Sequence, residues 1–172
     1  ALDRGELSQA LQMLSDWQGD PSLTSAESQE VNDLLGQLAG TVIYSTEHRL
    51  EPPYIVQAGE TLDQIATKCN VSSQLLGKIN GVAPGQALTP GQTLKVVKGP
   101  FTAVIDLSDR KLVLTLDRRY AGAFPVEIDP ALTVEDGQWE VVDKPLAPAS
   151  AATYNPSSDG VERSLMLQNP GA

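Results

Sequence analysis

Two adjacent prolines, Pro52-Pro53, constrain the fold of this chain more than any other feature. Proline lacks the amide proton that a helix interior needs, and it disfavours helical geometry in the residue before it. A helix that approaches residue 51 must therefore end there, and the chain must continue as an extended segment. We accordingly divide the 172 residues into three segments, 1–53, 54–98 and 99–172.

The first segment has the apolar spacing of two helices. Thr24 with Glu27 three residues later forms a capping box, which starts the second helix after the break at Asp20-Pro21. The apolar residues that recur at helical intervals are Leu7, Ala10, Leu11, Leu14 and Trp17, and then Val31, Leu34, Leu35, Leu38, Val42 and Ile43. We predict an antiparallel helical hairpin. It resembles one unit of a tetratricopeptide-type array, but no repeat is visible, and the alternative is a hairpin that simply packs against its neighbour.

The second segment has the order strand, helix, helix, strand. Tyr54 to Val56 is typical of a short strand, and Thr61 with Gln64 forms another capping box. Ser72 caps a second helix, which Asn80-Gly81 ends with residues suited to positive φ. A turn at Pro90-Gly91 then leads into a strand from Leu94 to Val97. The whole unit takes about 44 residues, so we predict a small βααβ module.

The third segment is typical of antiparallel β-structure. Apolar residues alternate over 101–107, 112–116 and 124–128, with turns predicted at 108–111 and 117–122. Further strands are predicted at 139–142 and 164–168, with a loop at 147–160. The fold class is therefore α+β: an N-terminal helical hairpin, a βααβ module and an incomplete antiparallel β domain.

Composition excludes several functions. The net charge of −10 repels phosphate backbones, so we expect no nucleic-acid partner. No apolar run reaches the roughly 20 residues that span a bilayer, and residues 1–4 do not begin a signal peptide. We expect no metal and no cofactor, because His48 has no Cys or second His near it. Cys69 is the one cysteine, and we expect it to be a buried thiol without a chemical role.

The second segment resembles a LysM domain along its whole length. The residues that agree in order and spacing are Tyr54, Val56, Gly59-Glu60-Thr61-Leu62, Ile65-Ala66, Val71-Ser72, Leu75-Leu76, Ile79-Asn80, Leu88, Pro90-Gly91-Gln92, Leu94 and Val96. The resemblance implies a βααβ fold and a β-1,4-linked glycan ligand that contains N-acetylglucosamine, either peptidoglycan or chitin. Residues 54–97 alone are expected to retain most of that binding.

The same resemblance implies where the glycan binds. In the family the sugar lies in a shallow groove between the loop after the first strand and the loop after the second helix. In this chain the ligand-binding residues would be Gly59, Glu60, Thr61, Leu62, Ile79, Asn80 and Gly81. Glu60 stands where the family usually has Asp, which alters the rim of the groove. Thr61 can also be explained as a helix cap, and Leu62 and Ile79 as core residues.

The third segment resembles the first half of a YkuD-type L,D-transpeptidase domain, over about residues 101–168. The residues that carry this resemblance are Val104-Ile105-Asp106-Leu107-Ser108, Arg110-Lys111-Leu112, Phe124-Pro125-Val126 and Gly137-x-Trp139. That family transfers acyl groups between peptide stems through a cysteine thiolate activated by a histidine. No His follows His48 and no Cys follows Cys69, so no catalytic residue can be assigned and the enzyme question stays open.

Three functions follow as hypotheses. The first is a catalytically silent chain of the bacterial cell envelope that binds peptidoglycan through its LysM module. The second is a fragment of a LysM-targeted L,D-transpeptidase that cross-links peptidoglycan stems. The third is a scaffold whose helical hairpin and β segment bind other proteins at the wall. An unpaired edge in the incomplete sheet would also offer a route to self-association.

Overall fold

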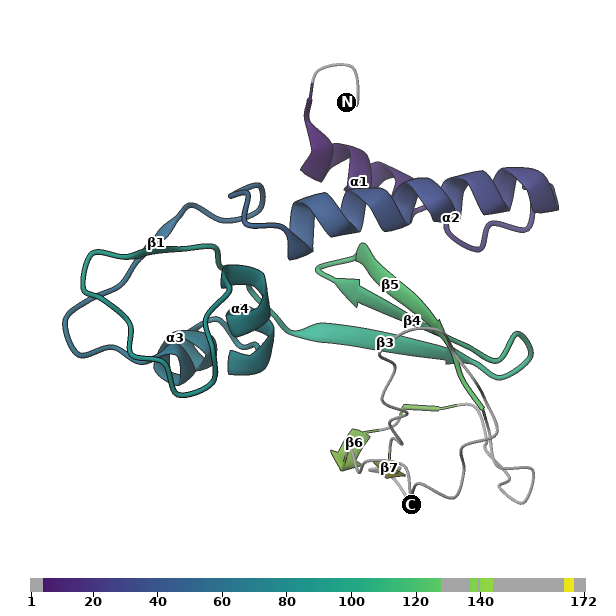
Figure 1. Ribbon diagram of the computed structural model, residues 1–172. Coiled ribbons are helices and arrows are strands. Elements are labelled where there is room, and N and C mark those ends of the chain that lie inside the picture. The colour runs from purple at the N-terminus through teal and green to yellow at the C-terminus, as the bar shows by residue number, and fades with distance from the viewer. Residues whose placement is uncertain (1–4, 128–136, 139, 144–165, 169–172) are drawn as a thin grey trace. The chain divides into compact units, whose positions relative to one another are not determined.

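The computed structural model describes residues 5–127, 137–138, 140–143 and 166–168. The chain divides into two units, Ala1–Ile128 and Asp129–Ala172. Helices and antiparallel sheets occur together, which confirms the α+β class (Figure 1). The boundaries predicted after residues 53 and 98 both lie inside the first unit, so the helical, βααβ and sheet segments are parts of one compact body.

The helical hairpin consists of α1 (Leu7–Ser15) and α2 (Ser25–Ala39), which continues into a π-helical turn, η2 (Gly40–Tyr44). The predicted capping box is confirmed: the Glu27 amide donates to Thr24 Oγ1 (3.3 Å) and the Thr24 amide donates to Glu27 Oε2 (2.8 Å). Trp17 lies beyond the end of α1 and is half exposed, so it does not join the core that its spacing predicts. The helical path ends at Tyr44, eight residues before Pro52.

The βααβ module has the predicted element order. Strand β1 (Tyr54–Ile55) pairs antiparallel with β2 (Thr93–Leu94), and helices α3 (Leu62–Lys68) and α4 (Ser73–Asn80) lie between them in the chain. The paired part of β2 is shorter than the predicted strand from Leu94 to Val97. Leu94 pairs with Tyr54 and the Val56 amide donates to the Gln92 carbonyl, so the next hydrogen-bonded pair would join Val96 to Pro52. Because proline has no amide proton, the ladder ends there.

Strands β3 (Phe101–Asp106), β4 (Lys111–Leu116) and β5 (Arg119–Pro125) form an antiparallel meander in the order β3-β4-β5. The turn predicted at 117–122 is wrong, since only Asp117 and Arg118 separate β4 from β5. Both residues have positive φ, 47° and 61°. Positive φ at both central positions is the geometry of a two-residue type I′ hairpin. Neither residue is the Gly or Asn that usually signals this turn, so the sequence pattern placed the start of β5 too late.

The hairpin helices are joined to β5 by two hydrogen bonds. Tyr44 donates its hydroxyl proton to the Ala121 carbonyl (2.7 Å), and Ser15 Oγ accepts from the Tyr120 amide (2.8 Å). A register shift at Leu114/Thr115 leaves Ala121 without a partner on β4, which frees its backbone for the tyrosine. The helical segment therefore packs against the edge strand of the meander.

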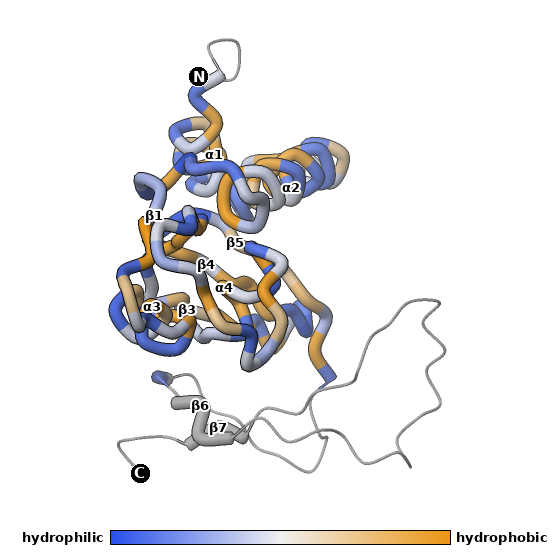
Figure 2. The backbone as a smooth tube through the Cα atoms, turned by 60° about the vertical axis from the view of Figure 1, so that its left-hand side comes forward, coloured by the Kyte–Doolittle hydropathy of each residue, from blue (hydrophilic) through white to orange (hydrophobic). Residues whose placement is uncertain are grey.

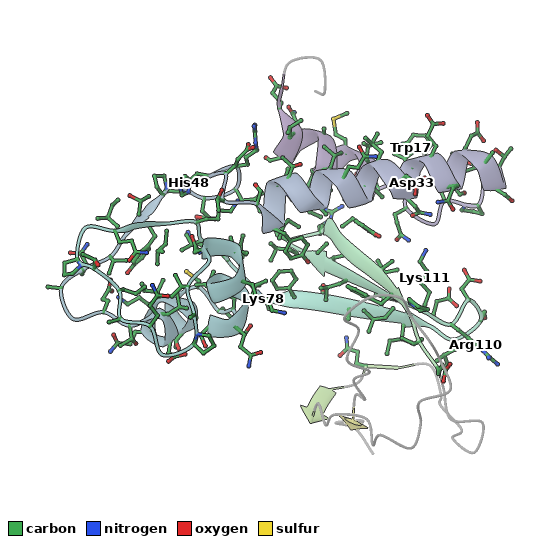
Figure 3. The ribbon with its side chains drawn as sticks, in the orientation of Figure 1. Trp17, Asp33, His48, Lys78, Arg110 and Lys111 are labelled. Carbon is green, nitrogen blue, oxygen red and sulfur yellow. The ribbon has the colours of Figure 1, made fainter. Side chains whose placement is uncertain are left out.

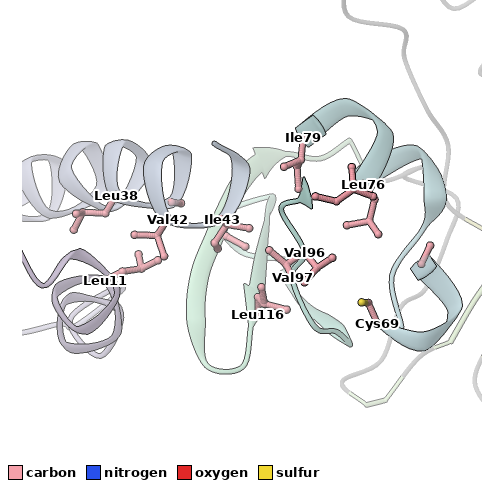
Figure 4. Close-up of a cluster of buried hydrophobic side chains, with 14 of the residues drawn as sticks. Leu11, Leu38, Val42, Ile43, Cys69, Leu76, Ile79, Val96, Val97 and Leu116 are labelled. Carbon is pink, nitrogen blue, oxygen red and sulfur yellow. The ribbon is translucent and has the colours of Figure 1, made fainter. Parts of the chain in front are cut away.

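A single hydrophobic core runs through the first unit (Figure 4). It includes Leu11 and Val42 from the helical segment, Leu76 and Val97 from the βααβ module, and Leu116 from the sheet. Figure 2 shows hydrophobic stretches on the helices, the βααβ module and the meander alike. The three segments thus bury their apolar faces against one another and share one core.

The second unit contains one short antiparallel pair, β6 (Glu140–Asp143) with β7 (Met166–Gln168). Strands were predicted at 139–142 and 164–168, and these two strands confirm most of both ranges. Trp139, Ser164 and Leu165 lie outside the described residues, as do Ile128 and the predicted loop at 147–160.

Candidate functional site

The first loop of the βααβ module turns at Gly59 and is braced by Glu60. Gly59 is exposed and has φ +81°, a conformation that glycine adopts without steric cost. The Glu60 carboxylate accepts hydrogen bonds from Lys68 Nζ (2.5 Å), from the Gln57 amide (2.8 Å) and from the Tyr54 hydroxyl (2.8 Å). These bonds tie the loop to β1 at one end and to α3 at the other.

The same contacts fix the charge of Glu60. Hydrogen bonding to the Lys68 ammonium, and then to the Gln57 amide and the Tyr54 hydroxyl, lowers the pKa of Glu60 to about 2. Glu60 is therefore ionised throughout the neutral and mildly acidic range. Its carboxylate already has three donors, so its main role in the loop is structural.

Thr61 caps α3, and Leu62 is the first residue of that helix. Thr61 is the helix cap: its Oγ1 accepts from the Gln64 amide (3.3 Å), and its own amide donates to Gln64 Oε1 (3.0 Å). Leu62 is half-buried beside α4. A Cβ built on Gly77 would lie 3.4 Å from Leu62 Cδ2 and 2.8 Å from the Val82 carbonyl oxygen. The absence of a side chain at Gly77 therefore lets the start of α3 and the chain that follows α4 each lie close to α4.

The second loop, Ile79 to Gly81, closes α4. Gly81 adopts the left-handed conformation (φ +66°), and its amide donates a hydrogen bond to the Gly77 carbonyl. The Val82 amide donates to the same carbonyl (2.9 Å). Ile79 is buried at 6% exposure and belongs to the core. Gly81 is exposed, so this loop offers mainly its backbone to a ligand.

Asn80 is held entirely by the protein. Its Nδ2 donates to the carbonyls of Leu76 (2.9 Å) and Lys95 (2.8 Å), and its Oδ1 accepts from the Lys95 amide (2.7 Å). Both backbone polar groups of Lys95 therefore pair with this one side chain. Asn80 fixes the second loop against the residue that follows β2.

The structure brings six of the seven predicted site residues into two adjoining loops and places the side chain of Ile79 in the core. The sequence did not indicate Tyr54, Lys68 or Lys95 as site residues. Lys68 is the last residue of α3, about two helical turns after Glu60, so the i, i+8 spacing could have suggested this pair. Lys95 follows Leu94, and strand alternation would place the two side chains on opposite faces.

Cys69 and His48 lie on different elements of the first unit. Burial raises the pKa of the Cys69 thiol, as expected for a cysteine with 6% exposure. His48 is exposed on the connection between η2 and β1 (Figure 3). A cleft of about 480 Å³ beside Glu51, Lys98 and Arg119 contains neither Cys nor His in its lining. Among residues 5–127 and the short described stretches after them, no cluster of three metal-ligating side chains occurs.

The fold and the two loops define a βααβ module with exposed turns at Gly59 and Gly81. Residues 54–97 match the family model of the LysM domain, over the same range that the sequence predicted, so this segment is a LysM domain. LysM domains in general bind peptidoglycan and other glycans that contain N-acetylglucosamine, and the match supports such a role for this chain. No curated protein matches the chain. These comparisons give no support to the L,D-transpeptidase resemblance over 101–168.

No helix among the described residues combines the length and the apolar character that crossing a membrane requires.

Proposed function

We propose that the LysM domain binds a β-1,4-linked glycan of the peptidoglycan or chitin type, and that the chain acts in the bacterial cell envelope without catalysing a reaction. The sugar would lie between the loop Gly59 to Leu62 and the loop Ile79 to Gly81. The observation that carries this proposal is the convergence of both segments on Gly77: Leu62 at the end of the first loop lies against it, and Val82 just after the second loop returns to it.

The chemistry of the loops suits an N-acetyl group. That group offers one amide donor, one amide acceptor and a methyl. Exposed backbone at Gly59 and Gly81 can meet the two polar groups, and the half-buried Leu62 side chain can meet the methyl. With a net charge of −10, the chain gains nothing from charge attraction to an anionic wall, so these short-range contacts would supply the affinity.

A pair of matched glycine variants tests the proposal. Gly59 and Gly19 are both exposed, with φ +81° and +76°, and neither has an atom within 4 Å of a built Cβ. Valine at either position imposes similar backbone strain. We expect the unaltered chain to pellet with insoluble peptidoglycan and to be released by chitin oligomers. Gly59→Val should weaken pelleting by excluding the sugar, and Gly19→Val should not. Equal behaviour of the two variants, or no pelleting of the unaltered chain, would reject the groove.

The second candidate function is a fragment of a LysM-targeted L,D-transpeptidase. The observation that favours it is the meander β3-β4-β5, which carries the residues of that resemblance from Val104 to Pro125. The gene beyond the codon for Ala172 decides between the candidates. A downstream His-Gly and Ser-x-Gly-Cys would favour the enzyme, and a stop codon would remove it. Self-association through a sheet edge is a further proposal, which sedimentation at several protein concentrations would test.

A further inference from the structure

Lys95 is a buried lysine whose side chain bonds to residues outside the LysM domain. It is 1% exposed, the lowest value of any charged residue described. Its Nζ donates to the Val42 carbonyl (2.9 Å) in η2 and to the Glu47 carbonyl in the connection that follows. Both acceptors belong to the N-terminal helical segment, 53 and 48 residues away in the chain.

A buried ammonium is costly unless hydrogen bonds compensate for lost water. A leucine or methionine would fill the same space without that cost. The acceptors at Lys95 lie at and just beyond the C-terminal end of a helix, where carbonyls lack intrahelical partners and the helix dipole favours a cation. The Glu47 carboxylate pairs with Arg49 (2.5 Å), and the Lys95 ammonium donates to two backbone carbonyls.

The backbone of the same residue holds the second glycan loop. The Lys95 amide donates to Asn80 Oδ1 (2.7 Å), and the Lys95 carbonyl accepts from Asn80 Nδ2 (2.8 Å). One residue thus connects two sets of hydrogen bonds. Its ammonium fixes the end of the helical segment, and its peptide groups fix Asn80, next to Gly81.

We infer that Lys95 is a positioning residue through which the N-terminal helical segment holds the second glycan-binding loop in place. This inference rests on the proposed function, and it names what governs the affinity of that site. It gives the helical hairpin a task in glycan binding without any contact to sugar. It also runs against the expectation that residues 54–97 alone retain most of the binding.

The test compares Lys95→Met with Lys98→Met in the full chain. Lys98 is 64% exposed and pairs with Glu51 (2.7 Å), so its replacement removes a charge without touching the Asn80 contacts. Titration with a chitin oligomer should give a Kd about fivefold or more weaker for Lys95→Met, the lower end of usual coupling between sites. Lys98→Met should leave the Kd unchanged. If the two variants bind equally well, the inference is overturned.

A double-mutant cycle separates positioning from general loss of stability. Asn80→Ala removes the hydrogen bonds between the second loop and the Lys95 backbone. In that background Lys95→Met should have little further effect on the Kd. Additive effects would overturn the inference, because the two residues would then act independently.

Hydrogen exchange on the unaltered chain covers the case in which Lys95→Met does not fold. Coupling is reciprocal, so saturating chitin oligomer should slow exchange at the Lys95 amide and across residues 40–47. Binding without added protection at 40–47 would overturn the inference while leaving the glycan site intact. Absence of any binding to the unaltered chain would remove the proposed function and this inference together.

Discussion

Two glycines in helix interiors should respond oppositely to the same substitution. Gly36 lies in α2 with nothing within 4 Å of a built Cβ, whereas a Cβ on Gly77 in α4 would lie 2.8 Å from the Val82 carbonyl oxygen. Gly→Ala in a helix interior gains about 1 kcal/mol from helix propensity. At Gly36 that gain should appear in full. At Gly77 an overpacking cost of about 1–3 kcal/mol opposes it, because the atom in the way is backbone.

Urea denaturation of Gly36→Ala and Gly77→Ala measures both outcomes. Gly36→Ala should raise the free energy of unfolding by about 1 kcal/mol, and Gly77→Ala should leave it level or lower it by up to about 2 kcal/mol. The expected difference between the variants is therefore about 1–3 kcal/mol. Gly77→Ala should also weaken glycan binding, since it displaces Val82, the residue after the second loop. If both variants are stabilised equally, the return of Val82 onto α4 is not tight, and the argument for a close groove loses support.

Three further predictions concern stability and activity. Thr24→Ala should cost about 1 kcal/mol in urea denaturation, because the α2 cap is lost; Thr46→Ala, at an exposed bend, should cost far less. Since the pKa of Glu60 is about 2 when folded and near 4.5 otherwise, its stabilisation is complete above about pH 4.5 and is lost as the pH falls towards 2. The difference in stability between the unaltered chain and Glu60→Gln should follow that window, and a difference that stays constant from pH 7 to 2 would contradict the assignment. The 172-residue chain should release no D-Ala from tetrapeptide-stem muropeptides, because acyl transfer needs a thiolate beside a base; D-Ala release that survives Cys69→Ser, seen by mass spectrometry, would show that the catalytic groups lie elsewhere.

The features that the sequence predicted best are local. The caps at Thr24, Thr61 and Ser72 each join a side chain to an amide three residues away, and all three occur as predicted. Gly81 ends α4 for an equally local reason, its left-handed conformation. The turn after β4 was predicted over 117–122 and is only Asp117-Arg118, because these residues adopt positive φ without the usual glycine or asparagine.

The candidate site was predictable in outline and not in detail. The LysM pattern placed both loops, since its spacing is a property of short segments. It could not show that the Asn80 side chain bonds to the backbone of Lys95, because that contact joins residues 15 positions apart. It could not show the burial of Lys95 either. That burial depends on helical residues about fifty positions earlier, and strand alternation carries no information about them.

The connection that leaves the LysM domain at Gly99 has a mechanical consequence. The Gly99 amide donates to the Cys69 carbonyl (2.8 Å), and a Cβ at this position would overlap the Asn70 carbonyl oxygen. This exit is a packed joint, in contrast to the flexible linkers that let a tethered domain sample many orientations. A pull exerted by a glycan strand would pass directly into β3 with no slack to absorb it. The molecule would thus hold the strand at one fixed angle, and several copies could share a load only where the wall presents its strands in a matching direction.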